Sequence, residues 1–242
     1  MIAIQTIQLT KRYKDTLAVD DLNLQIPQGE IFALLGINGA GKTTTIKMLT
    51  GLTVPTQGDA LLMGHSIRRD PVEAKQLIGV SPQETAVAPG LSVRENLQLI
   101  CGINGIPKEK SNARIAELAV QMGLEPVMEK KARKLSGGWQ RRLSIAMALI
   151  GQPKILFLDE PTLGLDVMAR SDLWQLIRRL KGKVTIVLTT HYMEEAEVLA
   201  DRIGIMKDGK LLLCDTADGI KAAAQTDRFE EAFVRIVKEA ER

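Results

Sequence analysis

The sequence predicts an α/β fold with a mainly parallel sheet. Three apolar runs, over 31–35, 155–158 and 184–188, are typical of strands that are buried on both faces. Helical patterns lie between these runs, and the clearest, over 136–150, repeats apolar residues on one face. Buried strands that alternate with amphipathic helices imply a parallel sheet with helices packed on its faces.

The segment before the first buried run predicts an N-terminal antiparallel β subdomain. Leu22, Leu24 and Ile26 alternate with polar residues, as in a half-buried strand. A Pro-Gln-Gly turn then follows at 27–29. We therefore expect short strands in this first part of the chain.

A helical insert interrupts the α/β pattern. The stretch 85–133 has helical patterns over 92–101 and 108–122 but no buried strand run, so we interpret it as an inserted α-helical subdomain. Further along, Asp208-Gly209 is a strong hairpin signal, and an apolar stripe near the end predicts a last helix. We divide the single domain into a core over 1–84 and 134–222, the insert over 85–133, and a C-terminal helix over 223–242.

Composition and charge narrow the class of protein. The chain has 242 residues, a net charge of +3 and only two cysteines, which lie far apart. Basic and acidic residues are well mixed, so no nucleic-acid partner is expected. The N-terminus has no secretory pattern, and no apolar run is long enough to span a membrane. We therefore expect a cytoplasmic protein that is peripheral to a membrane only through a partner.

A nucleotide-binding loop is predicted at 36–43. The sequence Gly-Ile-Asn-Gly-Ala-Gly-Lys-Thr matches the P-loop pattern, directly after a buried strand and before a helix. Its glycines let backbone N–H groups face phosphate oxygens, Lys42 can reach the β- and γ-phosphates, and the Thr43 hydroxyl can bind Mg²⁺. The alternative is a plain glycine-rich turn, which this context disfavours. The predicted ATP-binding residues of this P-loop NTPase core are Gly36, Asn38, Gly39, Ala40, Gly41, Lys42, Thr43 and Thr44.

Two adjacent carboxylates follow the second buried run. Asp159 and Glu160 lie where a parallel strand ends, and such strand ends commonly form sites. Asp159 suits Mg²⁺, and Glu160 could accept a proton from an attacking water. Taken alone, the pair could equally be a solvated turn.

The segment 135–142 is the start of the clearest helix. It has Ser136 as N-cap, followed by Gly137 and Gly138. A helix start offers free N–H groups and the positive end of the helix dipole, so the segment is either a second anion site or an ordinary capped helix. Because it lies between a P-loop and a strand-terminal Asp-Glu, it resembles the signature loop of ABC ATPases.

The resemblance to ABC ATPases extends over nearly the whole chain. Gln83 resembles the family's Q-loop glutamine, and 161–166 resembles its D-loop. His191 follows the third buried run, as the switch histidine does, and Tyr13 lies where the family stacks an aromatic ring on adenine. Taken singly, these could be a surface glutamine, a rim aromatic and a merely hydrogen-bonded histidine. Their order and spacing favour the family.

The resemblance implies a site that binds ATP and Mg²⁺ between two subunits. It assigns catalysis to Glu160, His191 and Gln83, and Mg²⁺ binding to Thr43, Gln83 and Asp159. It implies a homodimer or a paired ATPase subunit, with contacts to the partner's ATP from Ser136, Gly137 and Gly138.

Two residues depart from the family pattern. Ile37 replaces a common proline in the P-loop, which we expect to be harmless. Trp139 replaces the usual glutamine or similar residue of the signature loop. That substitution removes a side-chain amide, so no contact is transferred to this position.

The function that the resemblance implies is that of the ATPase subunit of a membrane exporter with a separate permease. The stretch 189–202 and the tail at 229–233 resemble ATPases of bacterial drug-resistance and sodium-extrusion exporters. The alternatives are a soluble ABC ATPase that acts on nucleic acid or ribosomes, and a nucleotide-binding scaffold without catalysis. The single P-loop in 242 residues disfavours the first, and Lys42 with Glu160 disfavours the second.

Overall fold

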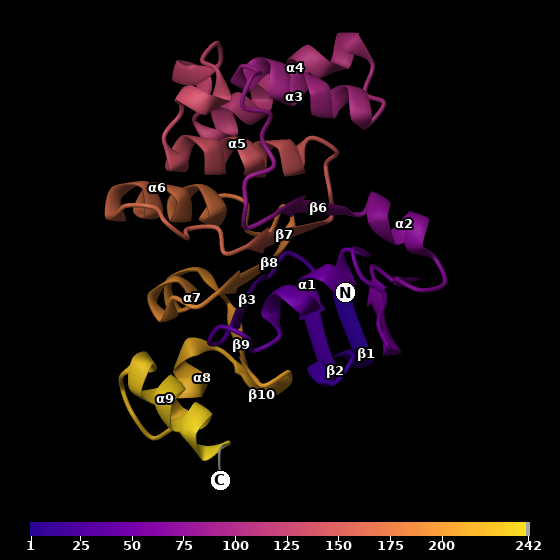
Figure 1. The fold of residues 1–242 in the computed structure, drawn as a ribbon. Coiled ribbons are helices and arrows are strands. Elements are labelled where there is room, and N and C mark those ends of the chain that lie inside the picture. Colours follow the sequence, from indigo (N-terminus) through magenta and orange to yellow (C-terminus); the bar gives the residue numbers. More distant parts are fainter. Residues whose placement is uncertain (241–242) are drawn as a thin grey trace.

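The computed structural model describes residues 1–240, which form two sheets with helices packed around them (Figure 1). The first sheet is antiparallel, with the strand order β2-β1-β4-β5. Its strands are β1 (Ile2–Tyr13), β2 (Thr16–Pro27), β4 (Gln57–Leu62) and β5 (His65–Ser66). This sheet is the predicted N-terminal antiparallel subdomain.

The second sheet has the strand order β10-β9-β3-β8-β7-β6, and all its neighbouring strands are parallel except β9 and β10. Its strands are β3 (Ile31–Leu35), β6 (Ile78–Ser81), β7 (Ile155–Asp159), β8 (Thr185–Thr190), β9 (Arg202–Lys207) and β10 (Lys210–Asp215). The three predicted buried runs are the inner strands β3, β8 and β7. The α/β fold with a mainly parallel sheet is therefore confirmed.

Both faces of the second sheet are covered, which explains the continuous apolar runs. Side chains alternate across a strand, so Ile31 and Leu35 of β3 enter the core formed with the helices. Phe32 and Leu34 enter a separate core, formed with the antiparallel sheet and the first helix. A strand between two cores has no solvent face and therefore no polar alternation.

The helices fall into groups around this sheet. They are α1 (Lys42–Leu49), α2 (Pro71–Gln76), α3 (Val93–Ile103), α4 (Lys108–Met122), α5 (Gly137–Leu149), α6 (Val167–Arg178), α7 (Met193–Leu199), α8 (Ala217–Ala223) and α9 (Phe229–Glu239), with short 3₁₀ turns at Glu125–Val127 and Ala132–Lys134. Helices α3 and α4 lie together beyond α5, at the opposite end of the molecule from α8 and α9 (Figure 1).

The C-terminal helix is shorter than the sequence predicts. Helix α8 ends at Ala223, and the next helix, α9, begins only at Phe229. Between them Gln225 has a φ of 52°, a left-handed conformation that no α-helix can include. Thr226 then accepts a hydrogen bond from the backbone N–H of Arg228, which forms a turn. Residues 241–242 of the predicted helix lie outside the described part of the chain.

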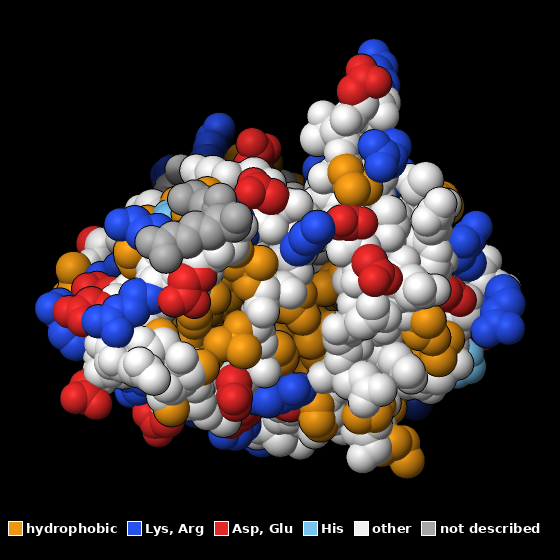
Figure 2. Space-filling model, turned by 90° about the horizontal axis from the view of Figure 1, so that it is seen from below, with side chains coloured by type: hydrophobic (Ala, Val, Ile, Leu, Met, Phe, Trp, Pro, Cys, Tyr) orange, Lys and Arg blue, Asp and Glu red, His pale blue; other side chains and the backbone are white. Residues whose placement is uncertain are grey.

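The surface mixes charges of both signs. Seen from below, apolar side chains gather in the middle of this face, and basic and acidic side chains are interspersed around them (Figure 2). No helix in the described residues 1–240 is both long and apolar enough to cross a membrane.

Candidate nucleotide site

The predicted P-loop connects the end of β3 to the start of α1 through a glycine-dependent turn. Gly39 and Gly41 have φ values of 84° and 102°, which residues with side chains rarely adopt. Gly36 is required for a different reason, because a Cβ there would lie 2.4 Å from the carbonyl oxygen of Met206. The loop can therefore hold this shape only with glycine at these positions.

Lys42 lies inside this loop. It is buried, and its Nζ donates hydrogen bonds to the carbonyl oxygens of Gly36, at 2.7 Å, and Ile37, at 3.1 Å. Burial lowers the pKa of Lys42, while the charges of Glu160 and Asp159 oppose that shift. The loop thus encloses a cation beside its backbone N–H groups, an arrangement that suits a polyanion such as a triphosphate.

Thr189, on strand β8, binds the carboxylate of Asp159, the last residue of β7, and the backbone of Glu160, which follows it. Its Oγ1 donates to Oδ1 of Asp159 at 2.5 Å and accepts from the backbone N–H of Glu160 at 3.0 Å. The hydroxyl of Thr43 donates to the same Asp159 oxygen at 3.4 Å. Thr43 and Asp159 therefore present two oxygen ligands close together, which is the donor set that Mg²⁺ prefers.

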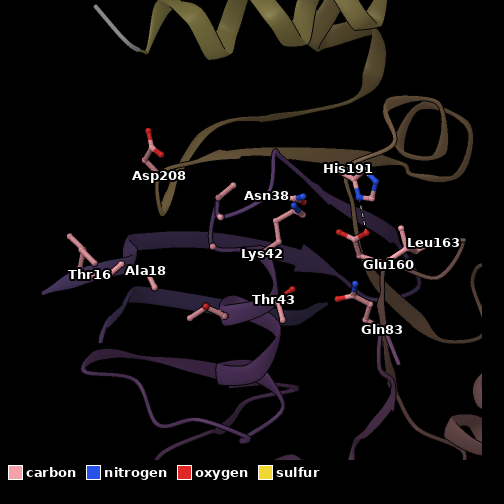
Figure 3. A pocket seen from close by; sticks show the side chains of 15 residues that line it. Thr16, Ala18, Asn38, Lys42, Thr43, Gln83, Glu160, Leu163, His191 and Asp208 are labelled. Carbon is pink, nitrogen blue, oxygen red and sulfur yellow. Dashed lines mark ion pairs between the residues drawn. The ribbon is translucent and has the colours of Figure 1, made fainter. Parts of the chain in front are cut away.

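Glu160 has an unusual backbone and faces His191. Its φ of 48° lies in the left-handed region, where a non-glycine residue is strained by about 1–2 kcal/mol. Its Oε2 lies 2.7 Å from Nδ1 of His191, and Figure 3 shows the two side chains facing each other across one end of the cavity. Strain that the surrounding fold maintains is typical of functional positions.

A cavity of about 690 Å³ extends from the P-loop to Glu160 and His191. The predicted site residues that line it are Asn38, Gly39, Ala40, Gly41, Lys42, Thr43, Thr44, Gln83, Glu160 and His191. Asn38 and Lys42 lie in its middle, and Gln83 lies on the same side as Glu160 (Figure 3). Gly36 and Asp159 do not line the cavity, but they contact Lys42 and Thr43, which do.

The other end of the cavity contains residues that the sequence analysis did not single out for binding. Thr16, Leu17, Ala18 and Asp208 line it there. Backbone hydrogen bonds from Asp20 to Gly209 and from Gly209 to Ala40 bring the β9–β10 turn to the P-loop. Segments that lie almost 200 positions apart meet here, and no local pattern marks such a contact.

Tyr13 is not among the residues that line the cavity. The residue is 44% exposed, and Nζ of Lys11 lies 4.8 Å from the centroid of its ring. The predicted contact between Tyr13 and adenine therefore stays a prediction.

Truncation of Tyr13 tests that contact. We expect Tyr13→Ala to weaken ATP and ADP binding by the same modest factor, about 2- to 10-fold, because a stacked ring does not contact the phosphates. Isothermal titration with both nucleotides measures the two factors. If the variant binds both nucleotides as the parent does, Tyr13 is a rim residue.

The signature loop lies outside this cavity. Ser136 is exposed at the N-terminus of α5, and its hydroxyl makes no capping hydrogen bond to the helix. Ser136, Gly137 and Gly138 are therefore not brought to the P-loop of their own chain. Their exposure leaves the first N–H groups of α5 free for a ligand.

The sequence analysis also did not single out a third carboxylate, that of Glu195 on α7, which lies beside Thr162 and Trp174. It is fully buried, and its Oε1 accepts hydrogen bonds from Oγ1 of Thr162 at 2.8 Å and Nε1 of Trp174 at 3.2 Å. Burial raises the pKa of Glu195 above its ordinary value, although these hydrogen bonds oppose the shift.

The raised pKa of Glu195 predicts a pH-dependent cost in stability. Between the ordinary value of 4.5 and the raised value, the folded state binds more protons than the unfolded state, so the free energy of unfolding falls as pH rises. Glu195→Gln removes the ionisable group and keeps an acceptor oxygen. We expect the free energy of unfolding of this variant to fall less than that of the parent as pH rises from 5 to 8.

Urea unfolding at several pH values measures that difference. Glu197→Gln is the matched control, because Glu197 lies on the same helix with its side chain 40% exposed beside Lys221. If Glu195→Gln and the parent lose stability in parallel over this range, Glu195 is ionised in the folded state and the prediction fails.

A glycine loop around a buried lysine, facing carboxylates at the ends of parallel strands, defines the protein first as a P-loop nucleotide hydrolase. The protein-family model described as "ABC transporter" matches residues 19–163, which is more than half of the chain. The chain therefore belongs to the ABC transporter family, as one of its ATPase domains. The suspected membership is confirmed.

Relatives and solved structures agree. The chain is 38% identical over 240 residues to the Escherichia coli protein "Probable multidrug ABC transporter ATP-binding protein YbhF", covering 97% of this chain and 41% of that one. It is 45% identical over 204 residues to the human "Phospholipid-transporting ATPase ABCA3", covering 84% of this chain and 12% of that one. The chain thus spans less than half the length of these relatives.

Two solved structures have the same fold. One is described as the "Structure of ATP binding subunit of ABC transporter", with a TM-score of 0.85 and 26% identity, covering 97% of this chain and 99% of that chain. The other is described as a dimeric "post-hydrolysis state of the ATP-binding cassette MJ0796 bound to ADP and Pi", with a TM-score of 0.78 and 28% identity, covering 88% of this chain and 98% of that chain.

Proposed function

We propose that this chain is the ATP-hydrolysing subunit of an ABC membrane exporter, and that it acts on a permease carried by another chain. The observation that carries the proposal is the position of Glu160. Its carboxylate lies at one end of the P-loop cavity, beside His191, where it can accept a proton from a water near the γ-phosphate.

The predicted site residues then have separate tasks. Lys42 and the N–H groups of its loop hold the phosphates, and His191 keeps the Glu160 carboxylate turned into the cavity. Thr43, Asp159 and Gln83 would hold Mg²⁺, which when bound neutralises phosphate charge. Because Thr189 bonds both Asp159 and Glu160, the metal ligand and the base keep a fixed spacing.

A second subunit completes the site in this proposal. Ser136, Gly137 and Gly138 do not reach the cavity of their own chain, and the Ser136 hydroxyl is free. In a head-to-tail pair they would face the γ-phosphate held by the partner's P-loop. A helix N-terminus favours the triphosphate over its products, so binding would close the pair and hydrolysis would open it.

In this proposal, the closing and opening of the pair powers the export of a substrate through the permease. The name of the YbhF relative refers to multidrug transport and that of the ABCA3 relative to phospholipid transport, which supports a membrane permease as the partner and the inner face of the membrane as the location. The alternative, an ATPase acting on nucleic acid or ribosomes, has no support from either name. The chain has 32 basic and 29 acidic residues, and this near balance gives nucleic acid little attraction.

Copurification from native membranes tests the proposal. We expect the tagged chain to bring a membrane-spanning permease with it and to release phosphate from ATP only in the presence of Mg²⁺. Copurification of ribosomes or DNA instead would support the alternative. A chain that binds ATP but releases no phosphate, alone or with its permease, would be a scaffold.

A further inference from the structure

Arg141 occupies an unusual place for an arginine. It lies on α5, one turn after the signature glycines, and only 4% of the residue is exposed. Its Nη1 donates to the carbonyl oxygen of Pro82 and its Nη2 to that of Gln83, each at 2.6 Å. The guanidinium thus donates hydrogen bonds to two successive carbonyl oxygens of the loop that contains Gln83, whose side chain lines the cavity.

From this geometry we propose that Arg141 is a positioning residue, which ties Gln83 to the signature helix so that the two move as one body. The inference deepens the proposed function, and it rests on that function for its effect on turnover. Arg141 itself does not line the cavity. It acts through Gln83, whose side chain does.

Two more contacts make α5 and the strand before Gln83 a single unit. The hydroxyls of Ser81 and Ser144 are buried and lie 2.8 Å apart, one helical turn after Arg141. Further along the helix, a Cβ on Gly79 would lie 2.2 Å from the carbonyl oxygen of Ala148, so β6 and α5 pack backbone against backbone. Displacement of α5 must therefore move Gln83 as well.

The cost of burying a guanidinium indicates that Arg141 positions the Gln83 loop and does more than fill space. A buried guanidinium is costly, and burial lowers the pKa of Arg141, while the charges of Asp159 and Glu195 oppose the shift. The planar fork of arginine can satisfy two neighbouring carbonyls at once, which a lysine ammonium on its flexible stem cannot do as well. A buried cation kept at this cost indicates that the orientation of the Gln83 loop matters.

The adjacent Arg142 lies on the same helix but makes different contacts from those of Arg141. Its Nη2 pairs with Asp172 at 2.8 Å near the surface, and its guanidinium lies 4.9 Å from the ring centroid of Trp139. It contacts α6 and its own helix, with no bond to the Gln83 loop. Substitution of Arg142 is therefore the matched control for loss of an arginine from α5.

Steady-state ATPase kinetics of Arg141→Gln and Arg141→Lys test the anchor. We expect kcat to fall about tenfold in both Arg141 variants, with the KM for ATP within about twofold of the parent, because the P-loop is untouched. Arg142→Lys is the control for hydrogen exchange, where amides of 83–88 should keep the parent rates, because Arg142 pairs with Asp172 and makes no hydrogen bond to the Gln83 loop. If Arg141→Lys restores the full parent rate, charge alone is required and the two-carbonyl anchor is wrong.

Hydrogen exchange without nucleotide separates this inference from the proposed function. In both Arg141 variants we expect amides of 83–88 to exchange about tenfold faster, while those of β7 and α1 keep the parent rates. Faster exchange throughout the domain, or unchanged exchange at 83–88, overturns the anchor. If Arg141→Gln does not fold, Arg141→Lys decides. If the parent chain has no ATPase activity, the proposed function is wrong, but the inference about Arg141 is still tested, because hydrogen exchange is measured without turnover.

Discussion

Replacing Glu160 with glutamine should stop ATP hydrolysis while leaving ATP binding intact. The substitution keeps the size and shape of the side chain but removes the carboxylate that can accept a proton from water. Lys42, Thr43 and Asp159 are unchanged, so the phosphates and Mg²⁺ keep their ligands. We expect kcat to fall by about 100- to 10,000-fold, the range that a general base contributes, with the dissociation constant for ATP within about twofold of the parent.

The same variant should also reveal the paired state. If the intact γ-phosphate bridges one P-loop to the partner's Ser136, a chain that cannot hydrolyse ATP should accumulate as a dimer in Mg-ATP and return to monomer in ADP. Light scattering after gel filtration measures the mass directly. Glu194→Gln, an exposed carboxylate only weakly paired with Arg170, is the control and should behave as the parent.

Two outcomes would contradict this reasoning in different ways. Turnover at the parent rate would remove Glu160 from catalysis. An inactive variant that stays monomeric in Mg-ATP would leave Glu160 as the base but remove support for pairing through Ser136. Trp139, which departs from the family pattern, follows the signature glycines on α5 and is half-buried under Arg142. If Trp139 prevents pairing of the isolated chain, pairing should require the permease. The same measurement on a permease-bound preparation is therefore the control.

Local patterns predicted the fold and the phosphate end of the site. The inner strands were predictable because burial on both faces leaves an uninterrupted apolar run, and the P-loop because one short segment contains its glycines, Lys42 and Thr43. The end of a strand made Asp159 and Glu160 candidates, but the resemblance to ABC ATPases was needed to prefer a site over a solvated turn.

The supporting residues could not be predicted, because their partners lie far away in the sequence. Arg141 bonds a carbonyl 58 positions away, and Glu195 accepts from Thr162, 33 positions away. Thr189 bonds Asp159 across two strands that pair only in the folded sheet. In the sequence these are an arginine on a helix, one acidic residue among several and a threonine in a strand. Only the strand order of the sheet brings each to the site.

Lys42 should be the residue on which nucleotide affinity depends most. Its ammonium is the cation inside the P-loop, and a charged hydrogen bond to a phosphate oxygen is worth about 1.5–3 kcal/mol. We expect Lys42→Ala to weaken ATP binding by about 10- to 150-fold, with a smaller loss for ADP and almost none for AMP, because Lys42 reaches the β- and γ-phosphates.

Fluorescence titration with the three nucleotides measures that order of losses, and circular dichroism confirms that the variant is folded. Lys47→Ala is the matched control, because Lys47 lies on the same helix but points to solvent. Equal losses for AMP and ATP would mean that the substitution disturbs the loop rather than a phosphate contact. Unchanged affinity for ATP would show that the backbone N–H groups and the start of α1 hold the phosphates without Lys42, and the assignment of this lysine would be wrong.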